Sequence, residues 1–262
     1  MGGRWRHRLG YAVAAALAVA VCGVCAVALQ WRPLSSGVDG EPACRPAALS
    51  AAAPGDLAVV EQGFTLGDDG TLSIGAILGN HGKQQVAYRT RVTFRVVRID
   101  GTPVLSPDPF QEIPVVLPGR RVAVGAAVHV PAADRAAVSG VVFDLSATRW
   151  VAYDTRNPLL RPPVTSLVGR LSDPARPAEI SFLIDDSGCR DAGLAERGVG
   201  MAFRDAGDAI VGGGLALGAG EGSCSGAGGG YGVPALHLPA TADPARSEVS
   251  VYCDVPGSQR AS

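Results

Sequence analysis

Lysine is nearly absent from this sequence, and an excess of either charge is missing as well. A single lysine, Lys83, stands against 22 arginines among 262 residues, and the formal net charge is −1. Binding to nucleic acid needs a clustered basic surface that neutralises phosphates, so the charge balance gives no reason to expect nucleic acid as a partner. Alanine, glycine, valine and proline are abundant, which suggests a GC-rich genome in which codon supply explains part of the arginine content.

Helical periodicity is missing from most of the chain. Beyond the N-terminal segment, no stretch keeps an apolar stripe at the helical spacing of about 3.6 residues for three turns. Glutamate and glutamine are few, whereas valine, threonine, glycine and proline are frequent. β-branched residues fit the pleated surface of a sheet, and glycine and proline suit tight turns. The sequence therefore predicts an all-β protein after its first segment, with little helix.

One long hydrophobic run is present near the N-terminus. Residues 11–29 carry no charge and follow Arg4, Arg6 and Arg8. A helix of this length, at about 1.5 Å per residue, spans the roughly 30 Å hydrocarbon core of a bilayer. Because basic residues stay on the cytoplasmic side, we expect residues 1–10 in the cytoplasm, a transmembrane helix over 11–30, and export of the rest.

The same run allows a second interpretation. It is rich in alanine, so its insertion into a bilayer is marginal, and Ala26-Val27-Ala28 has the small-x-small form of a signal-peptide cleavage site. The chain is expected either as a single-pass cell-membrane protein with a cytoplasmic N-terminus or as a secreted protein with a cleaved signal peptide. Both interpretations place residues 33–262 outside the cytoplasm.

The exported region is patterned as short strands separated by turns. Apolar residues alternate with small or polar ones over 72–78, 86–96 and 122–130, which is typical of half-buried antiparallel strands. Asp100-Gly101 and Pro118-Gly119 are turn signals between these strands. Strands broken by turns at such intervals indicate a sandwich or a barrel.

A second copy of this pattern follows the first at an offset of about 106 residues. Strands and turns recur in the same order, with low identity. The corresponding segments are 72–78 with 178–184, Asp100-Gly101 with Ala206-Gly207, 130–132 with 238–240, and 141–144 with 251–254.

This duplication predicts two tandem sandwich domains of immunoglobulin-like size. Each is long enough to bury a core of its own. We expect a flexible, proline-rich spacer before the first domain, a semi-rigid linker between the two, and a disordered tail. The predicted boundaries are a spacer at 31–56, domains at 57–150 and 164–257, a linker at 151–163 and the tail at 258–262.

On the segments 94–101, 201–205 and 210–214, the two repeats resemble the FxLYD-type immunoglobulin-like domains of bacterial envelope proteins. The resemblance covers residues 57–150 and 164–256. It implies a strand that runs into an acidic-glycine hairpin, a later Pro-Gly turn, and a terminal strand preceded by proline. The chain departs from the family motif, since residues 95–99 only approximate Phe-x-Leu-Tyr-Asp. The family implies no catalytic residues.

Six cysteines divide between the hydrophobic run, with Cys22 and Cys25, and the exported region. In an oxidising exterior the four exported cysteines are expected to form disulfides, for which three connectivities are possible. We favour a bond between Cys189 and Cys224, which would tie the glycine-rich loop to the strand beside it. Cys44 and Cys253 are then left over, and their pairing would require the two domains to fold back on each other.

No group of residues predicts a catalytic, cofactor or metal site. The segment 222–226, Gly-Ser-Cys-Ser-Gly, has the outline of a nucleophile elbow, but the glycines that follow cannot open the helix that an elbow needs. A thiol- or metal-dependent activity centred on Cys224 is kept as the alternative. Three further groups are interpreted as solvated or packed side chains rather than as sites: the histidines 81, 129 and 237, the aspartates 185, 186 and 191, and the strand arginines 89, 91 and 95.

The sequence thus predicts a non-enzymatic binding or structural protein of the bacterial cell envelope, tethered by residues 11–30. Immunoglobulin-like domains bind through loops or strand edges rather than through a conserved motif. The expected partner besides the membrane is an envelope protein or a wall polymer.

Overall fold

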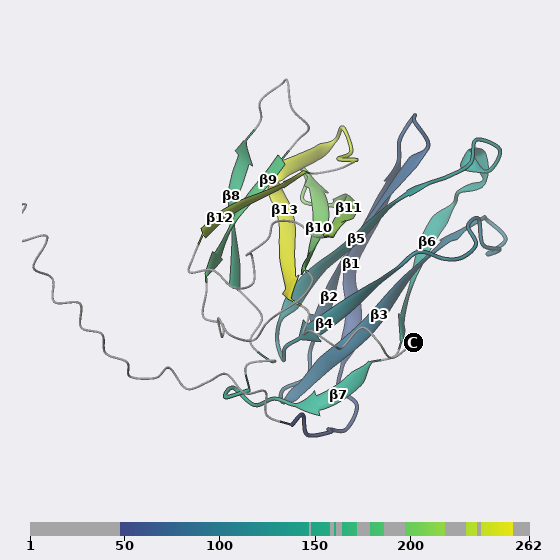
Figure 1. Ribbon diagram of the computed structural model, residues 1–262. Coiled ribbons are helices and arrows are strands. Elements are labelled where there is room, and N and C mark those ends of the chain that lie inside the picture. Colours follow the sequence, from purple (N-terminus) through teal and green to yellow (C-terminus); the bar gives the residue numbers. More distant parts are fainter. Residues whose placement is uncertain are drawn as a thin grey trace, which may run out of the picture. The chain divides into compact units, whose positions relative to one another are not determined.

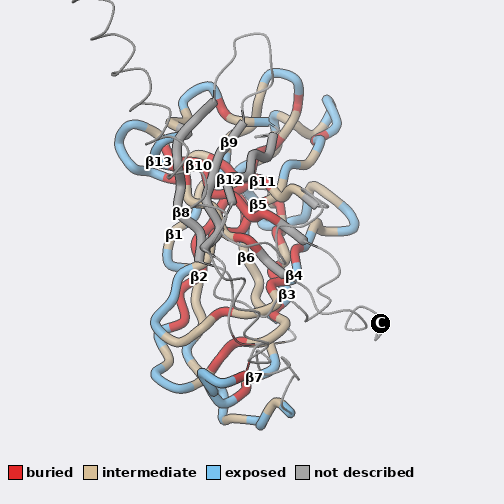
Figure 2. The backbone as a smooth tube through the Cα atoms, turned by 60° about the vertical axis from the view of Figure 1, so that its left-hand side comes forward, coloured by how far each residue is buried: buried red, intermediate tan, exposed pale blue. Residues whose placement is uncertain are grey.

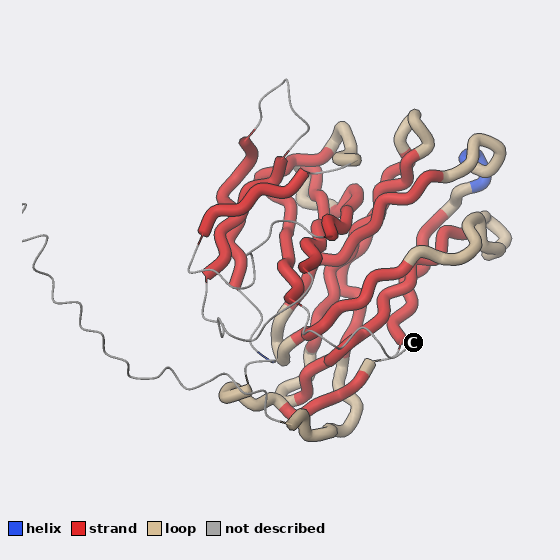
Figure 3. The backbone as a smooth tube through the Cα atoms, viewed as in Figure 1, coloured by secondary structure: helices blue, strands red, loops and turns tan. Residues whose placement is uncertain are grey.

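Antiparallel strands make up nearly all of the regular secondary structure in the structure, a computed structural model (Figure 3). It describes residues 48–146, 148–157, 160, 164–171, 179–185, 197–217, 229–234 and 237–253. Within these ranges helical conformation is confined to one 3-10 turn, η1 (Arg135–Ala137), and to Leu160, which also has 3-10 conformation. The near absence of helix confirms the all-β expectation. The predicted segments 1–10 and 11–30 lie outside the described residues. In the described part of the chain no helix has the length and apolarity needed to cross a membrane.

Two sheets form the first half of the described chain, which we define as β1 to β7. One sheet has the order β1-β2-β5, and the other has the order β4-β3-β6, with β7 also paired to β3. The predicted strands 72–78 and 122–130 correspond to β2 and β5. The strands are β1 (Leu57–Leu66), β2 (Thr71–Asn80), β3 (Gln85–Val97), β4 (Phe110–Val116), β5 (Arg121–His129), β6 (Gly140–Ser146) and β7 (Arg149–Ala152).

Two further sheets form the second half, which we define as β8 to β13. Their orders are β8-β9-β12 and β11-β10-β13. When β8 is matched to β1 and each following strand to the next, the pairings of β1 to β6 recur among β8 to β13 (Figure 1). The pairing of β7 with β3 has no counterpart in the described part of the second half. The strands are β8 (Val164–Leu171), β9 (Glu179–Asp185), β10 (Arg197–Asp205), β11 (Ile210–Leu217), β12 (Gly229–Pro234) and β13 (Ala242–Cys253).

The two sheets of the first half pack face to face around an apolar core. Alternate residues of β2 and β3 point into it, and the Phe94 ring meets the Phe143 ring edge to face with centroids 5.5 Å apart. Burial of these side chains removes apolar surface from water, which is the main force that holds such sheets together. The fully buried members on these two strands are Leu72, Ile74, Ala76, Leu78, Ala87, Val92, Phe94 and Val96.

The alternation in β3 changes sides at Arg89. Residues 92–96 follow the expected pattern, but Ala87 rather than Val86 joins the core between the sheets. Val86 and Tyr88 pack instead in a separate cluster. Arg89 has a φ of 53°, in the left-handed region, so the extended period of two is interrupted there. The expectation that one face runs unbroken from 86 to 96 is wrong for this reason.

The described ends of the expected spacer and linker lie against the first half. Ala51 forms a bridge with Val151 on β7, and the Ala52 amide donates to the carbonyl of Trp150 at 3.0 Å. Leu160, from the expected linker, is 1% exposed and packs against Val151. These contacts fix both segments to the end of the first half where β7 lies.

A buried asparagine joins the end of β2 to both β3 and β4. Asn80 is 1% exposed, and its side-chain NH₂ group donates to the carbonyls of Gln85 at 2.8 Å and Val116 at 3.0 Å. Its carbonyl oxygen accepts from the Gly82 amide at 3.0 Å. The nitrogen and the oxygen of this side chain therefore both have partners, and they tie the turn between β2 and β3 to the end of β4.

We expect Asn80→Ala to destabilise the fold. The substitution leaves the carbonyls of Gln85 and Val116 without this donor and the Gly82 amide without its acceptor. A buried polar group left without a partner costs about 1–3 kcal/mol, so we expect the free energy of unfolding to fall by about 2–3 kcal/mol. Urea unfolding followed by circular dichroism measures it. The exposed Gln62→Ala on β1 is the control, and equal stabilities of the two variants would contradict the role of Asn80.

Candidate functional site at a glycine-lined junction

Strands of the second half cover the outer face of sheet β1-β2-β5. As a result β2 is buried on both faces, from Leu72 to Asn80. Ile77, on the face away from the core of the first half, packs with Ala202 of β10 and Ile210 of β11. Figure 2 shows the buried backbone concentrated where β5, β10 and β11 come together. We call this contact the junction.

The backbones touch at the junction because glycines face each other. A Cβ on Gly75 would overlap the carbonyl oxygen of Gly212, and one on Gly213 would lie 2.6 Å from the Ile74 carbonyl oxygen and 2.7 Å from the Gly75 Cα. A Cβ on Gly125 would likewise collide with the backbone of Gly214. Sheets that pack through side chains stand about 10 Å apart, so this approach requires glycine at these positions.

Hydroxyl groups of the first half bind the outer edge of β11. The Ser73 hydroxyl donates to the carbonyl of Gly213 and accepts from its amide, both at 3.0 Å. The Thr65 hydroxyl donates to the Val211 carbonyl at 2.6 Å. Since β11 is the end strand of its sheet, these bonds satisfy an edge that would otherwise be open to pairing with other chains.

The edge of β5 is bound in the same way, in part by the second half. The Ala123 amide donates to the Ser250 hydroxyl of β13 at 2.8 Å. The Gly125 amide donates to the side-chain oxygen of Gln111 at 3.1 Å. Each half thus supplies side chains that satisfy a strand edge of the other half.

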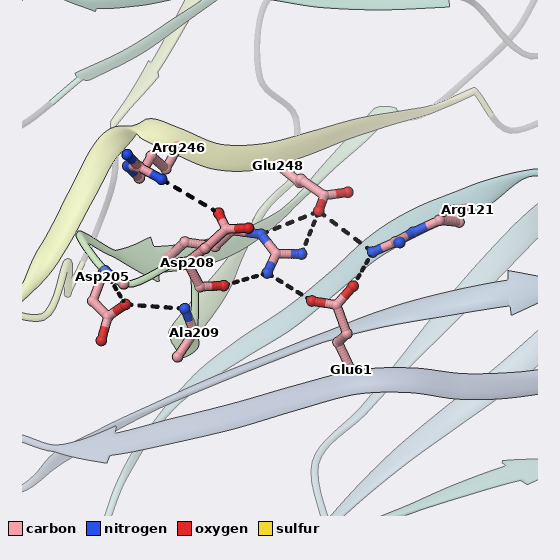
Figure 4. Close-up of polar contacts among 9 residues, drawn as sticks. Glu61, Arg121, Asp205, Asp208, Ala209, Arg246 and Glu248 are labelled. Atoms are coloured by element: carbon pink, nitrogen blue, oxygen red, sulfur yellow. Dashed lines mark hydrogen bonds and ion pairs between the residues drawn. The ribbon is translucent and has the colours of Figure 1, made fainter.

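A four-residue ion-pair cluster lies beside these contacts (Figure 4). Arg204 of β10 is 5% exposed, and its guanidinium donates to Glu61 of β1 at 2.6 Å, to Glu248 of β13 at 2.5 Å and to the carbonyl of Asp208 at 2.7 Å. Arg121 of β5 also pairs with Glu61 and lies 3.6 Å from Glu248. The two arginines and two glutamates balance in charge across the junction.

Mutual hydrogen bonding shifts the titration of this cluster. The Arg204 side chain lowers the pKa of the Glu61 carboxyl below its usual 4.5, with a further contribution from Arg121. Glu61 in turn raises the pKa of Arg204, against the opposing effect of burial. A buried guanidinium stays charged. The stability of the junction therefore depends on partner carboxylates that remain ionised.

A cavity of about 290 Å³ opens where the junction ends. Its walls come from β5, β10, β11 and the start of β4. The Phe110 side chain at its rim is 55% exposed, whereas Met201 is 1% exposed. The described lining is mainly apolar or small, and His237 is the one titratable residue among the described lining residues. Its members include Phe110, Gly125, Ala127, Met201, Leu215 and His237.

Most of the residues singled out as disulfide or nucleophile candidates fall outside the described residues. Cys44, Cys189 and Cys224 do so, as does the segment 222–226, so the proposed disulfides and the elbow stay predictions. Cys253 lies at the end of β13, where it is paired with Arg197 of β10.

The strand arginines are largely engaged with neighbouring side chains of their own sheet. Arg95 pairs with Asp144 at 2.6 Å and with Asp108 at 3.4 Å. The Arg91 guanidinium lies over the Phe110 ring at 4.3 Å from its centroid. Arg89 lies 3.5 Å from Glu112. These contacts favour the interpretation of the strand arginines as packed side chains of a sheet surface rather than as a site.

The histidines lie in different parts of the fold, and His237 also lines a second pocket together with Asp68 and Asp69. His81 follows β2, His129 ends β5 and His237 lies at the cavity. Across the ranges that the structure covers, no group of three His, Cys, Asp or Glu side chains is placed to hold a metal ion.

The residues of the junction were not identified from the sequence as a site. Glu61, Arg121, Arg204 and Glu248 lie far apart in the chain, and isolated charged residues in strands give no signal of pairing. Glycines inside strands are a usable signal, because they often mark a close approach of another backbone. Gly75 and Gly125 interrupt strands that otherwise alternate well.

Comparisons of the chain with protein-family models, with curated proteins and with solved structures found no match.

We expect Gly213→Ala to weaken the junction, because the added methyl group collides with backbone atoms of β2 that cannot rotate away. Overpacking of this kind costs about 1–3 kcal/mol, measured as a fall in the free energy of unfolding in urea. Gly140→Ala on β6 is the matched control, since its Cβ would meet only Val97 at an ordinary 3.7 Å. A loss of the same size in both variants would contradict the tight contact.

We expect the stabilisation by Glu61 to depend on pH. Its pKa is lowered in the folded protein, so the contribution is complete above about pH 5 and is lost as the pH falls through the folded-state value. Glu61→Gln should cost about 1 kcal/mol at pH 7, since the carboxyl is partly exposed, and progressively less as the pH falls and the carboxyl is protonated in the folded protein. Unfolding of both proteins across this range measures the difference.

Glu112→Gln is the control for this titration. Glu112 pairs with Arg89 at 3.5 Å on the surface of the first half, away from the junction, and its removal should change stability little at any pH. A constant difference between Glu61→Gln and the unsubstituted protein from pH 7 to pH 3 would rule out the ionised carboxylate as the source.

Proposed function

We propose that this chain is a non-enzymatic binding or structural protein of the bacterial cell envelope, anchored in the membrane by residues 11–30. Its exported part would consist of two tandem immunoglobulin-like sandwiches of the FxLYD type, with the N-terminus in the cytoplasm. The alternative is a secreted form of the same domains after cleavage of a signal peptide. The basic residues before an uncharged run support the export of the rest.

The observation that carries this proposal is the junction. Its buried and partly buried polar groups are used to join one sheet to another: Ser73 and Ser250 bind strand edges, and Arg204 pairs with carboxylates from two strands. Such an arrangement holds two sandwiches in a fixed relation, which suits a rigid module that presents loops and edges to a partner. The matching strand order of the two halves supports the proposed duplication.

The second candidate is a thiol-dependent activity centred on Cys224. The glycine-rich segment around this cysteine favours it only weakly, because an elbow requires a strand before and a helix after the nucleophile. Titration of free thiols in the folded, unreduced protein separates the two candidates. Unreactive exported cysteines support the binding role, whereas a reactive Cys224 supports the alternative.

We expect a reporter enzyme fused after Ser262, active only outside the cytoplasm, to be active when the full chain is expressed in bacteria. The reason is that the arginines before residue 11 hold the N-terminus inside. The same fusion without residues 1–32 is the control and should be inactive. A cytosolic reporter on the full chain would contradict the proposal, and loss of residues 1–28 from the mature mass would select the secreted form.

A further inference from the structure

The junction runs directly into the cavity along two strand edges. β5 and β11 cross at Gly125 and Gly214, where their backbones touch. On one side of this crossing, hydroxyl groups bind both edges. On the other side the cavity of about 290 Å³ lies between the two strands, with Ala127 and Leu215 in its lining.

The edge of β5 continues into the cavity in register. In an antiparallel pair, the backbone groups of every second residue point away from the paired neighbour. On β5 these are the groups of Ala123 and Gly125, whose amides donate to Ser250 and Gln111. Ala127 is next in this series, and it is exposed. Among the described residues, none bonds to its outward amide.

The edge of β11 behaves in the same way. Gly213 uses both of its outward groups on the Ser73 hydroxyl, so Leu215, two residues further, is the next to point outward. No hydroxyl of the first half reaches Leu215 within the part of the chain that the structure describes. The residues that carry the next outward groups of the two edges, Ala127 and Leu215, therefore both line the same cavity.

The side chains around these edges are suited to an apolar residue. Phe110 stands exposed at the rim, and Met201 and Leu215 line the wall. Gln111 is 3% exposed, and its side-chain nitrogen has no hydrogen-bond partner among the described residues, although its oxygen accepts from Gly125. A buried donor without a partner thus lies beside the edge of β5.

We propose that the cavity receives an extended polypeptide segment of another protein, which adds as a strand along the edge of β5 at Ala127. One apolar side chain of this segment would lie between Phe110 and Leu215. The inference deepens the proposed binding role and rests on it.

The open edge selects the chemistry of the partner. At Ala127 it offers the backbone amide and carbonyl of a strand edge, which another polypeptide backbone matches and a saccharide or lipid does not. Continuity with the junction supports the same conclusion. Two steps earlier on this edge, at Ala123, the position is already occupied by a group from a neighbouring strand, the Ser250 hydroxyl.

A blocked heptapeptide of alternating threonine and valine with a central phenylalanine is the probe. It is titrated into the detergent-solubilised full chain while hydrogen exchange of the Ala127 and Leu215 amides is measured. We expect the exchange of the Ala127 amide to slow by about tenfold at saturation, because it enters a ladder. The same peptide with every second amide N-methylated is the control and should not protect Ala127.

Ala127→Pro removes the amide donor at a position where an edge strand tolerates proline, and we expect it to weaken peptide binding about three- to tenfold. Ala127→Ser keeps the amide and should bind like the unsubstituted chain. Ala127→Trp fills the cavity without changing the amide, so it tests the site even if the proline variant fails to fold.

Three results would overturn the inference. In the first, the peptide fails to bind the unsubstituted chain. In the second, the proline and tryptophan variants bind the peptide as well as the serine variant does. In the third, sedimentation shows that the chain associates with itself and that Ala127 is protected without peptide, which makes a second copy the occupant. None of these results bears on the reporter fusion, so failure of the inference is distinguishable from failure of the proposed function.

Discussion

Direct contact between glycine backbones at the junction determines how the two halves of this chain are joined. Gly75 and Gly125 on the first half meet the glycines of β11 with no side chain between them. An apolar interface of ordinary thickness tolerates small changes, because side chains can shift rotamers. Backbone atoms have no such freedom, so this contact admits a narrow set of relative positions.

Such a close approach brings backbone amides and carbonyls into a region with little water, where each needs a partner. The hydroxyls of Ser73 and Ser250 are short enough to reach a strand edge in that space, and they do so. Arg204 contributes to the junction through ion pairs rather than through a strand edge. Its burial carries a desolvation cost, which Glu61 and Glu248 offset only while the strands that carry them keep their positions. The ion-pair cluster therefore helps to fix the relative orientation of strands that the glycines allow to approach closely.

Much of the fold could be predicted from the sequence, because strands with one buried face leave a period of two. β2, β5 and the later part of β3 carry that signal, and the turns between them carry glycine or proline. The prediction failed at Arg89, where a left-handed residue exchanges the faces of β3. A left-handed backbone is uncommon for residues other than glycine, and arginine is not among the residues enriched in it. The sequence therefore gives no signal of this conformation at position 89.

The junction was beyond the reach of the same reasoning, because it depends on pairs of residues more than a hundred positions apart. Ser73 and Gly213 are neighbours only once both halves have folded, and either residue alone is unremarkable in a strand. The sequence does show the glycines that the contact requires, and a glycine inside a strand lowers the stability of that strand. Several such glycines at one level of successive strands are tolerated only when close packing returns the stability. Interior glycines that recur in two copies of a repeat are therefore a reason to expect the copies to pack against each other, even where no motif connects them.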